Sequence, residues 1–577
     1  MIFYDFEVFK HDWLAVFIDR KTTKETVIVN DKNALEAFYE ANKKDIWVGF
    51  NNARYDQWIL KGILAGFNPK EINDWIIVQR KQPWKFSRLL NRFYTVQYDV
   101  MTSLNRGLKV YEAYQGHSII ESSIRFDTDR KLTESELEQT IMYCRNDVIE
   151  TANLFFLNLE DFHAHLELVR MTGEQPDMTL LSKTKVQLSA MILEAQKPIE
   201  DRKDEFDIDF PENLRIEKYR KILDWYSDPK NKTYKIDHAD KNPTKNELKM
   251  MIGGIPHQLG YGGIHGAIDG YHGTGYFLLA DVTSLYPSLM IEYDLLSRNC
   301  SKAGIERYKE IYKERLELKK AGKKAEQLPL KLVLNSTYGA MKYKYSQLYD
   351  PRQANRVCVY GQLFLVDLIE KLEGTVEIIQ SNTDGVLMKL DRKEDFYKVD
   401  DICFEWEKRT RLSLEFKEYH KVFQKDVNNY LLVDHTGGYT GIGEVKRLSN
   451  LDNNLPIINQ ALVDYMVNGT PVEQTIRACD DLIMFQQVDK LSDKYEHFLH
   501  NGIELNERCV RSFASLDPMD TGFKKLHGST GSVEKVSNSA ERVFVENGNI
   551  VHSKVPDKLN KDHYIEMAQR RLEKFGI

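Results

Sequence analysis

The sequence predicts a multidomain α/β protein, and three observations lead to this prediction. The chain has 577 residues, which is too long for a single hydrophobic core. Its first 30 residues contain three short β-like runs, IFYDFEV, WLAVFID and ETVIV, and helical patterns follow them. Between residues 276 and 390, an apolar β run, two helical patterns and a β-hairpin pattern follow one another. Strands that alternate with helices in this way are typical of α/β domains.

The composition excludes several classes of protein. With 42% hydrophobic and 29% charged residues it is typical of soluble globular domains. No apolar run approaches the roughly 18 residues that a membrane span needs, and the N-terminus lacks the features of a signal peptide. The six cysteines form no CxxC pair, so neither a zinc knuckle nor a disulfide framework is predicted. We expect a cytoplasmic protein without membrane contact, in the host cytoplasm if a phage encodes it.

The net charge of −7 argues mildly against a protein coated in nucleic acid, but it leaves room for a local basic surface. One candidate is QRKQPWKFSRLLNR, residues 79–92, which has five basic residues, no acid, and Trp84 and Phe86 between the cations. Basic charge with interleaved aromatic rings suits single-stranded nucleic acid. A solvated loop with two core aromatics is an equally good interpretation of this segment.

An acid ends the apolar β run at residues 276–280. Asp281 opens the stretch DVTSLYPSL. A buried, unpartnered carboxylate costs several kcal/mol or loses its charge. Either Asp281 caps the helix that follows, or it binds a metal ion.

A second acid lies in a predicted hairpin. TVEIIQSNTDGVLMKL, residues 375–390, has two β runs around Asp384-Gly385. Asp-Gly is a routine turn pair, but a hairpin tip and a strand end can also lie side by side in one sheet. Asp281 and Asp384 could then share one or two Mg²⁺ ions, as in two-metal phosphoryl transfer.

The chain between these acids carries cations on two predicted helices. Residues 305–324 form one amphipathic helix, which places Arg315 and Lys319 on one face at i,i+4. Pro329 suits the first turn of a second helix, on which Lys331 and Asn335 lie one turn apart and Tyr338-Gly339 continues the same face. Each lysine alone could be part of a solvated face. The order of acid, basic helical hairpin and acid favours binding of a triphosphate.

The N-terminal third contains a second group of acids. Asp5 and Glu7 lie on the first β run, and Asp56 follows Asn52 in the stretch NARYD. A long helix begins after residue 132 with a capping box of Thr133 and Glu136. Further along this helix, Tyr143 and Asp147 share one face at i,i+4 spacing. By contrast, residues 200–250 are polar and are predicted to be a connector, and the glycine-dense stretch 260–275 is predicted to be a loop.

The central motifs resemble those of the family B DNA polymerases. DVTSLYPS is similar to motif A, D-x-x-S-L-Y-P-S. KLVLNSTYG, residues 331–339, is similar to motif B, K-x-x-x-N-S-x-Y-G, and SNTDG is similar to motif C, usually D-T-D-S. The resemblance implies that Asp281, Asp384 and the Val282 carbonyl bind Mg²⁺, or Mn²⁺, at a two-metal site. It also implies nucleotide-binding roles for Ser284, Leu285, Tyr286, Arg315, Lys319, Lys331, Asn335 and Tyr338, with Tyr286 under the sugar.

The N-terminal acids resemble the proofreading nuclease of the same family. Asp5-Phe6-Glu7, Asn52-Ala-Arg-Tyr-Asp56 and Tyr143-Cys-Arg-Asn-Asp147 follow the order of its three motifs. The resemblance implies that the four carboxylates bind two metal ions that activate water, and that Tyr143 orients the water or the scissile phosphate. The expected activity is 3′→5′ removal of mispaired ends. Contacts with DNA are implied for Asn52, Tyr261, Gly263, Gly339 and Tyr430.

Several positions depart from the family patterns. Asn382 replaces the first aspartate of motif C, and Gly385 replaces its serine. The primer-binding pattern K-x-Y has lost its lysine and reads Asn-Asn-Tyr430. The Tyr261-Gly-Gly263 loop matches only partly. Since Asp384 is retained, we expect activity. The changes in motif C leave open which metal ion the site prefers.

The resemblance also implies an architecture. We expect an RNase H-like exonuclease domain over 1–165, a connector over 166–265 and a right-hand polymerase over the rest. The expected palm is an antiparallel sheet with helices, formed by residues 266–300 and 346–448, and the fingers are a helical hairpin over 301–345. Residues 449–577 would be the thumb by position only, where Lys524 and Lys525 either touch duplex DNA or are plain surface.

The predicted function is extension of a primer 3′ end with dNTPs on template DNA, with proofreading, in a phage or mobile element. The gaps between motifs, 50 residues from Asp281 to Lys331 and 43 from Gly339 to Asn382, leave no space for the insertions of protein-primed members. We therefore expect that no terminal protein is needed but that a separate helicase and single-strand-binding protein are. We also expect a monomer. The alternatives are a primer-independent polymerase of the same family and a catalytically inactive DNA-binding homologue.

Overall fold

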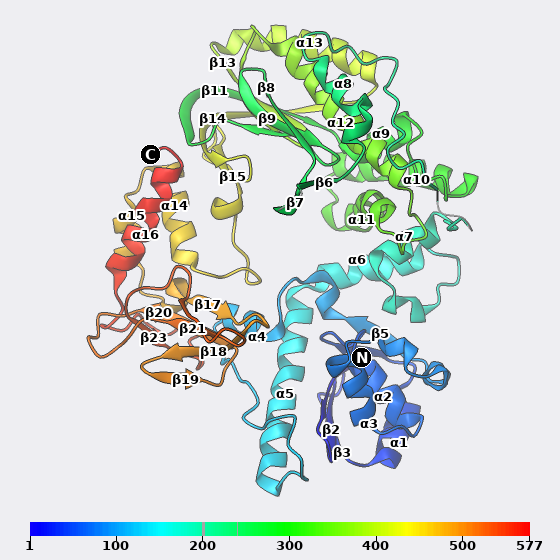
Figure 1. Ribbon diagram of the computed structural model, residues 1–577, viewed down its shortest axis with the longest axis vertical. Helices are drawn as coiled ribbons and strands as arrows, with labels where there is room; N and C mark the ends of the chain where they lie inside the picture. The colour runs from blue at the N-terminus through cyan, green and yellow to red at the C-terminus, as the bar shows by residue number, and fades with distance from the viewer. Residues whose placement is uncertain (199–201, 239–240) are drawn as a thin grey trace. The chain divides into compact units, whose positions relative to one another are not determined.

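The computed structural model describes residues 1–198, 202–238 and 241–577, which pack as two compact units (Figure 1). The first unit consists of Met1–Thr184, Leu448–Ile457 and Ile476–Tyr564. The second consists of Lys185–Arg447, Ile458–Thr475 and Ile565–Ile577. Two parts of the predicted connector, 199–201 and 239–240, lie outside the described residues. The mixture of helices and several sheets confirms the predicted multidomain α/β class.

A five-stranded sheet forms the centre of the first unit. Its strands run in the order β3-β2-β1-β4-β5. The strand bounds are β1 Ile2–Val8, β2 Trp13–Asp19, β3 Glu25–Val29, β4 Ile46–Gly49 and β5 Val96–Asp99. The first three strands match the three predicted β runs. Strand β1 pairs with β2 antiparallel and with β4 parallel, which places it in the middle of the sheet.

Helices and aromatic side chains cover this sheet. The helices are α1 Lys32–Asn42, α2 Asp56–Leu64, α3 Pro69–Asn73, α4 Leu108–Tyr114, α5 Glu134–Leu157 and α6 Leu159–Arg170. The capping box of Thr133 and Glu136 is present at the start of α5, as predicted, because each side chain bonds the other residue's backbone N–H. Helix α5 contacts β1 and β2. On the sheet, the fully buried rings of Tyr4 and Trp47 pack edge to face.

Two small sheets complete the first unit. One has the order β17-β20-β23 and the other β19-β18-β21-β22. Their strands are β17 Gln487–Lys490, β18 Tyr495–His500, β19 Ile503–Leu505, β20 Cys509–Ala514, β21 Lys524–His527, β22 Val533–Lys535 and β23 Val543–Val545. The predicted thumb span 449–577 is therefore divided between the two units, and its role stays a prediction. Lys524 and Lys525 lie on β21, where Lys525 contacts the Tyr495 ring.

A nine-stranded antiparallel sheet dominates the second unit. Its order is β16-β15-β14-β11-β13-β12-β10-β9-β8. The strands are β8 Glu247–Ile252, β9 Ile255–Gly260, β10 His265–Ala267, β11 Tyr271–Val282, β12 Glu377–Asn382, β13 Gly385–Leu390, β14 Leu414–Asp426, β15 Asn429–Val433 and β16 Tyr439–Ile442. A separate two-stranded ribbon consists of β6 Lys235–His238 and β7 Lys241–Lys245. The hairpin predicted over 375–390 is confirmed as β12 and β13.

Two sequence-based expectations for this sheet were wrong. The stretch 260–275 is not one loop, because it contains β10 and the start of β11. Nor is 247–252 part of a connector, because β8 is the edge strand of the sheet. The glycines that suggested a loop permit close approach instead: a Cβ at Gly266 would collide with the His257 ring on the neighbouring strand.

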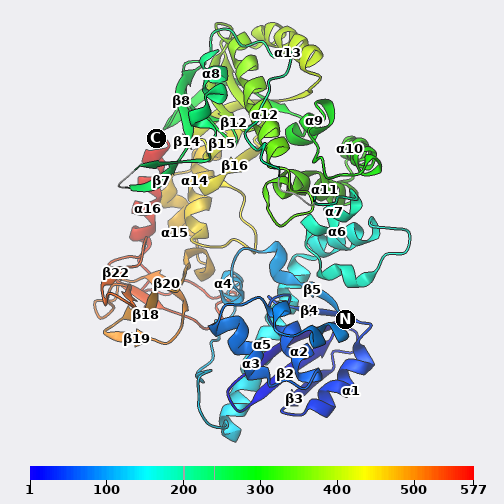
Figure 2. The ribbon, with the colours of Figure 1, turned by 45° about the vertical axis from the view of Figure 1, so that its right-hand side comes forward.

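The helices of the second unit cover this sheet and extend from it (Figure 2). They are α7 Lys185–Ile192, α8 Lys221–Ser227, α9 Leu285–Glu292, α10 Lys302–Lys320, α11 Lys324–Lys342, α12 Pro351–Leu372 and α13 Phe396–Thr410. Three further helices, α14 Pro456–Asn468, α15 Val472–Ala478 and α16 Lys561–Lys574, contain residues of both units. Helix α12 is buried almost all round and contacts β8, β13 and α9. Within the described ranges, no helix is both long enough and apolar enough to cross a bilayer.

The helical hairpin predicted after Asp281 is present as α10 and α11. The Tyr308 hydroxyl on α10 donates to the Leu334 carbonyl on α11 over 3.2 Å, and Gly322 takes a φ of 71° in the connecting turn. The second helix begins at Lys324, five residues before the predicted start. Pro329 is therefore inside the helix rather than in its first turn, which gives up one backbone hydrogen bond.

Candidate active sites

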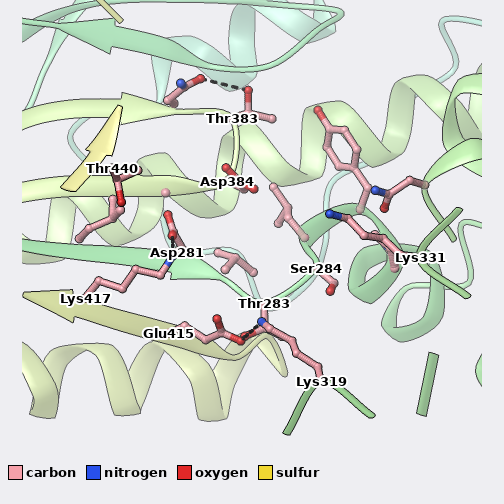
Figure 3. Close-up of a pocket in the computed structure, with 18 of the residues that line it drawn as sticks. Asp281, Thr283, Ser284, Lys319, Lys331, Thr383, Asp384, Glu415, Lys417 and Thr440 are labelled. Atoms are coloured by element: carbon pink, nitrogen blue, oxygen red, sulfur yellow. Dashed lines mark hydrogen bonds and ion pairs between the residues drawn. The ribbon is translucent and has the colours of Figure 1, made fainter. Parts of the chain in front are cut away.

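The register of the large sheet brings the two central acids together. Asp281, near the end of β11, lies opposite Gly385 at the start of β13. The Val282 N–H donates to the Asp384 carbonyl over 2.7 Å. Asp281 and Asp384 therefore lie on adjacent strands and line the same cavity, as Figure 3 shows.

The backbone around these acids is unusual at two non-glycine positions. Ser284 and Thr383 both have φ of 50°, in the left-handed region. Such conformations cost of order 1 kcal/mol or more and cluster at functional sites. Ser284 immediately precedes α9, and Thr383 forms the tip of the β12–β13 hairpin.

Gly385 has a steric reason to replace the motif C serine in this chain. A Cβ built at Gly385 would collide with the Asp281 carboxylate. Because the two residues are register partners, any side chain at position 385 would have to displace Asp281. Glycine in place of the motif C serine at position 385 therefore leaves space for the Asp281 carboxylate.

Two side chains of β14 that the sequence analysis did not single out also line the cavity. The Lys417 ammonium lies 2.9 Å from an Asp281 carboxylate oxygen, and Lys319 pairs with Glu415 at 2.5 Å. Glu415 also accepts a hydrogen bond from the Thr283 hydroxyl at 3.2 Å. Burial and the neighbouring Asp281 charge raise the pKa of Asp384 to about 6. A pattern of alternating charges on β14 is visible in the sequence, but only the sheet register shows which acid they face.

The helical hairpin supplies the cationic wall of the cavity, whose volume is about 680 Å³. Arg315 is 9% exposed, and its guanidinium donates to the Ser284 hydroxyl over 2.6 Å. Lys331 and Asn335 are exposed on α11 and line the same cavity, as do the buried Leu285 and the half-buried Tyr286 at the start of α9. The Tyr286 ring packs against Tyr338 with a centroid distance of 4.3 Å. All eight predicted nucleotide-binding residues thus line one cavity.

Asn382 and Tyr430 form the opposite edge of the cavity. The Asn382 amide donates to the Val427 carbonyl over 3.3 Å, which a carboxylate could not do. Burial raises the pKa of Tyr430, as does the Asp281 charge, while hydrogen bonds with Gln380 and Asn382 oppose the shift. The predicted contact of Tyr430 with DNA stays a prediction.

The other predicted DNA contacts of this unit lie close to the hairpin tip or to α11. A Cβ at Gly263 would lie 2.8 Å from the Thr383 hydroxyl. The Tyr261 carbonyl accepts a hydrogen bond from Lys342 at 2.9 Å, and its buried hydroxyl has no partner among the described residues. Gly339 is exposed, and a Cβ there would meet nothing within 4 Å. DNA binding by these three residues stays a prediction.

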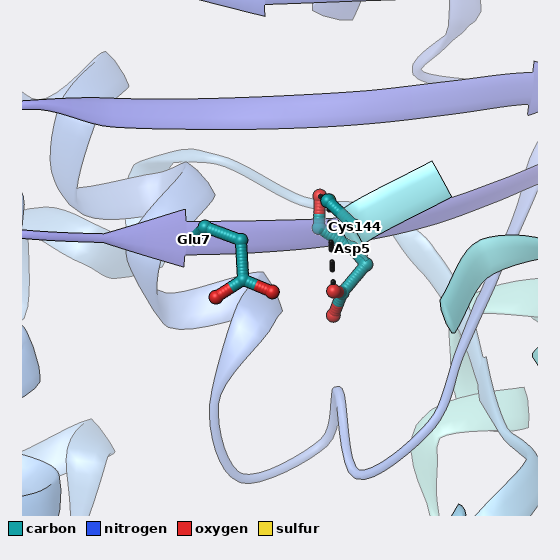
Figure 4. A group of neighbouring side chains, drawn as sticks. All are labelled: Asp5, Glu7 and Cys144. Atoms are coloured by element: carbon teal, nitrogen blue, oxygen red, sulfur yellow. Dashed lines mark hydrogen bonds between the residues drawn. The ribbon is translucent and has the colours of Figure 1, made fainter. Parts of the chain in front are cut away.

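The acids of the first unit also come together. Asp5 and Glu7 project from β1, Asp56 begins α2 and Asp147 lies on α5. Asp56 accepts a hydrogen bond from the Phe6 N–H at 3.2 Å, which joins α2 to β1. Ligand atoms of Asp5, Glu7 and Cys144 lie within 4.8 Å of one another (Figure 4).

The four carboxylates lie in a largely buried part of the first unit. Glu7, Asp56 and Asp147 are each at most 9% exposed. Burial and the Asp147 charge raise the pKa of Asp5 to about 7. Burial, followed by the Asp5 charge, raises the pKa of both Glu7 and Asp56 well above the ordinary value. Such mutual repulsion is typical of acids arranged around a cation.

Lys109, which the sequence analysis missed, is the ammonium that pairs with this cluster in the described residues. It pairs with Asp147 and, at 2.9 Å, with Glu112. Its ammonium also lies 4.7 Å from the centre of the Tyr143 ring. Only its position on α4, which packs against α5, reveals its role, since a lone lysine gives no signal in the sequence.

The remaining predicted residues of this site support its walls. Burial and the Asp147 charge raise the pKa of Tyr143, so its hydroxyl remains protonated. Cys144 donates to an Asp5 carboxylate oxygen at 3.6 Å. Asn52 is fully buried, and its amide donates to Gln97 at 2.8 Å. Its predicted contact with DNA stays a prediction, since no part of the side chain reaches the surface in this structure.

Both carboxylate groups fit divalent cations by the chemistry of their donors. Hard oxygen ligands suit Mg²⁺ and Mn²⁺. At the first site four clustered acids face a single paired lysine, Lys109, so their charge exceeds that of their protein partners. At the second site, burial and the Asp281 charge raise the pKa of Asp384 to about 6, and the carboxylates of both acids line the cavity. The identity of the metal stays a prediction.

Comparisons with known proteins point in the same direction as the motifs. No family model matches the sequence. The chain is 28% identical to the DNA polymerase alpha catalytic subunit of Trypanosoma brucei brucei over 177 residues, covering 22% of this chain and 13% of the relative. It is also 28% identical to the corresponding subunit of Leishmania donovani over 175 residues, with the same coverage. The match therefore spans about an eighth of the length of either relative.

A solved structure is also similar over the whole chain. The family B DNA polymerase from the hyperthermophilic archaeon Pyrobaculum calidifontis aligns with 100% of this chain and 77% of its own, with a TM-score of 0.41 and 15% identity. The three motifs gathered in one cavity and the sequence matches to catalytic subunits make this chain similar to DNA polymerases.

Proposed function

We propose that this protein is a DNA-directed DNA polymerase that extends a primer 3′ end with dNTPs and removes mispaired ends in the 3′→5′ direction. One observation carries the polymerase part: Asp281 and Asp384 adjoin each other in a cavity whose other wall carries Arg315, Lys319 and Lys331. The acids can hold metal ions, and fixed cations lie opposite them. Metal ions and fixed cations together complement the negative charge of a triphosphate.

The residues of the cavity divide the work of nucleotide transfer. Asp281, Asp384 and the Val282 carbonyl would hold the metal ions. Two bound divalent cations would stabilise the attacking and leaving oxygens of the displacement. Lys331 and Arg315, with Lys319, stabilise the charge that develops on the pyrophosphate, while the backbone of Ser284 and Leu285 contacts the phosphates. The remaining residues position the sugar and the base pair, namely Tyr286, Asn335 and Tyr338.

The first unit would perform hydrolysis at its four carboxylates. Asp5, Glu7, Asp56 and Asp147 would hold two divalent cations, which would lower the pKa of a bound water. Tyr143 keeps its proton and donates to the water or to the scissile phosphate. The buried walls exclude other solvent, which strengthens these electrostatic contacts.

Two alternatives predict different behaviour. An inactive DNA-binding homologue finds support in Asn382, yet the six predicted catalytic acids are all retained and are gathered at two sites. A primer-independent polymerase would start chains on single-stranded template. The helices α9 and α10 occupy most of the chain between Asp281 and Lys331, and α12 occupies half of that between Gly339 and Asn382, which favours an ordinary primer end over a terminal protein.

The deciding experiment uses a labelled primer with a 3′ mismatch on a longer template, with Mg²⁺ or Mn²⁺. Shortening without dNTPs and extension with them would support both activities. Synthesis of new chains on a template that has no primer would favour the primer-independent alternative. Binding of the DNA without either reaction would favour the inactive homologue.

A gapped template tests the expected partners. We expect synthesis to fill the gap and stop at the downstream strand, because the chain between Gly339 and Asn382, half of which is α12, leaves no space for an insertion that parts the duplex. Addition of a helicase and a single-strand-binding protein should then restore progress. Rapid synthesis through a long downstream duplex by the protein alone would contradict this expectation.

A further inference from the structure

The segment that follows α3 forms an exposed surface on the first unit. It consists of the π-turn Asp74–Val78 and two 3₁₀ turns, Pro83–Lys85 and Arg88–Arg92. The segment is well anchored, because the Phe86 ring packs edge to face on Phe67 and Trp75, and Leu90 is fully buried. The other side chains of the segment are therefore exposed although its backbone is held by packed residues.

This surface combines apolar groups with positive charge. Ile77, Val78 and Trp84 are 58%, 70% and 51% exposed, which is costly for a cluster of large apolar side chains. Five exposed cations lie among them: Arg80, Lys81, Lys85, Arg88 and Arg92. None of the five forms an ion pair with a carboxylate in the described part of the chain. We call these eight side chains the 77–92 surface.

The 77–92 surface adjoins the carboxylates of the same unit. The Tyr55 hydroxyl donates over 2.7 Å to Asn73, which directly precedes the π-turn. Tyr55 also directly precedes Asp56, and the charges of Asp56, Glu7 and Asp5, after burial, raise its pKa. On the other side, the Trp84 ring lies 6.5 Å from the ring of Trp58, near the start of α2. These two contacts join the segment that carries the surface to residues 55–58, which include Asp56.

We propose that the 77–92 surface binds single-stranded DNA and directs its 3′ end to Asp5, Glu7, Asp56 and Asp147. The inference rests on the proposed nuclease function and adds its strand-binding site. Unpaired cations complement a phosphate backbone, and an exposed indole between them offers a face on which a base can stack. Only an unpaired strand exposes a base face, so the pairing of Trp84 with cations favours a single strand over duplex.

The test measures equilibrium binding of a fluorescein-labelled 12-residue oligothymidylate by anisotropy. The buffer contains EDTA, so that no strand is cut, and the KCl concentration runs from 50 to 200 mM. Contact with all five cations would give a log–log salt slope of about −3.5 for a single strand. We expect Trp84→Ala to weaken binding on the order of tenfold with the slope unchanged. The triple variant Lys85→Gln, Arg88→Gln, Arg92→Gln should flatten the slope by about 2.

A matched triple variant controls for net charge. Lys21, Lys24 and Lys44 are exposed lysines of the same unit, and their replacement by Gln should leave affinity and slope unchanged. A thermal melt of each variant checks that the exposed substitutions leave folding intact. In Mg²⁺, Trp84→Ala should raise the KM for 3′ degradation of a single strand more than it lowers kcat.

The outcomes separate this inference from the nuclease proposal. If Trp84→Ala and the 85/88/92 variant bind the oligonucleotide as the unmodified protein does, the strand-binding inference is wrong. Equal losses for the Lys21/Lys24/Lys44 control would also overturn it. Binding of the surface to anionic lipid vesicles in place of the oligonucleotide would assign it to a membrane instead. If strand binding depends on Trp84 but no condition yields degradation, the nuclease proposal fails and the binding surface stands.

Discussion

The two carboxylate sites of this chain manage negative charge in opposite ways. In the first unit, four acids are packed into a buried volume with one paired lysine, Lys109. In the second, two acids lie at the edge of an open cavity whose cations come from three directions: Lys417 on β14, Arg315 and Lys319 on α10, and Lys331 on α11. Both sites can hold divalent ions, but among the described residues more cationic side chains surround the acids of the second site.

This difference follows from what each site would have to bind. A hydrolytic site brings in a single phosphodiester, so most of its cationic charge must come from metal ions. A site for triphosphates receives a substrate that carries several negative charges, so fixed protein cations can neutralise part of this charge beside the metal ions. Burial, followed by the charge of a neighbouring acid, raises the pKa to about 7 for Asp5 and to about 6 for Asp384.

The sharpest test is to remove one acid from each site. We expect Asp384→Ala to lower primer extension on the order of 10³-fold or more, because the metal-stabilised charge of the transition state is lost. Degradation of a 3′ mismatch should persist. Asp5→Ala should show the reverse pattern, and both rates come from the same labelled primer. Normal extension by Asp384→Ala would remove the assigned role of the cavity.

A smaller effect is expected at the aromatic wall of the second site. Tyr286 packs against Tyr338 beside the acids, and a ring under the sugar leaves no space for a 2′-hydroxyl. Tyr286→Val should improve ribonucleotide use relative to deoxyribonucleotide use by about 10- to 100-fold. Single-nucleotide insertion kinetics measure this ratio, with Tyr312→Phe as a control on the neighbouring helix. An unchanged ratio would refute the steric role.

Lys417 allows a third test, of the positive charge beside the acids of the second site. Its ammonium is paired with Asp281, so a divalent ion must compete with it. The lysine side chain is half exposed, so the competition is modest, and Lys417→Met should tighten Mn²⁺ binding about two- to fivefold. Electron paramagnetic resonance can count free Mn²⁺ in an Asp5→Asn, Asp147→Asn background. Weaker binding would show that Lys417 supports the metal site instead of opposing it.

Much of the architecture could be predicted because local patterns determine it. The first three strands, the capped helix α5 and the hairpin around Asp384 follow from alternation, capping and turn residues that are adjacent in sequence. One of the wrong expectations concerns glycine. Gly266 looked like a loop residue, but it lies in strand β10. It is a glycine there because the His257 ring of the neighbouring strand leaves no space for a side chain. A contact between separate strands cannot be read from one stretch of sequence.

The same limit explains which site residues were predicted. Asp281, Lys331 and Asp384 lie in motifs, and their assembly into one cavity was expected. Lys417 and Lys109 were missed, because each acts through a partner more than 30 residues away in the sequence. Pairing across β11 and β14, or between α4 and α5, fixes their roles. Long-range partners of this kind become visible only in the folded chain.

The smallest expected effect concerns stability, and it tests whether the buried cluster is under electrostatic strain. The pKa of Asp5 is raised to about 7 by burial and by Asp147, so the folded state holds this proton more tightly than the unfolded state. Asp5 therefore costs no stability below the ordinary carboxyl pKa, and its cost grows as the pH rises toward 7. At pH 8 in EDTA, Asp5→Asn should raise the Tm by a few °C, since about 1 kcal/mol corresponds to roughly 2–4 °C in a domain of this size.

The gain should shrink at pH 5, where the carboxyl of Asp5 is largely protonated, and it should shrink again at pH 8 when Mg²⁺ neutralises the cluster. Glu71→Gln, at an exposed acid of the same unit, should leave the Tm unchanged at either pH. Differential scanning calorimetry of the two variants and the unmodified chain gives all of these values. A lower Tm for Asp5→Asn at pH 8 would mean that the hydrogen bonds Asp5 accepts outweigh the repulsion, and the contrast between a strained and a compensated site would have to be abandoned.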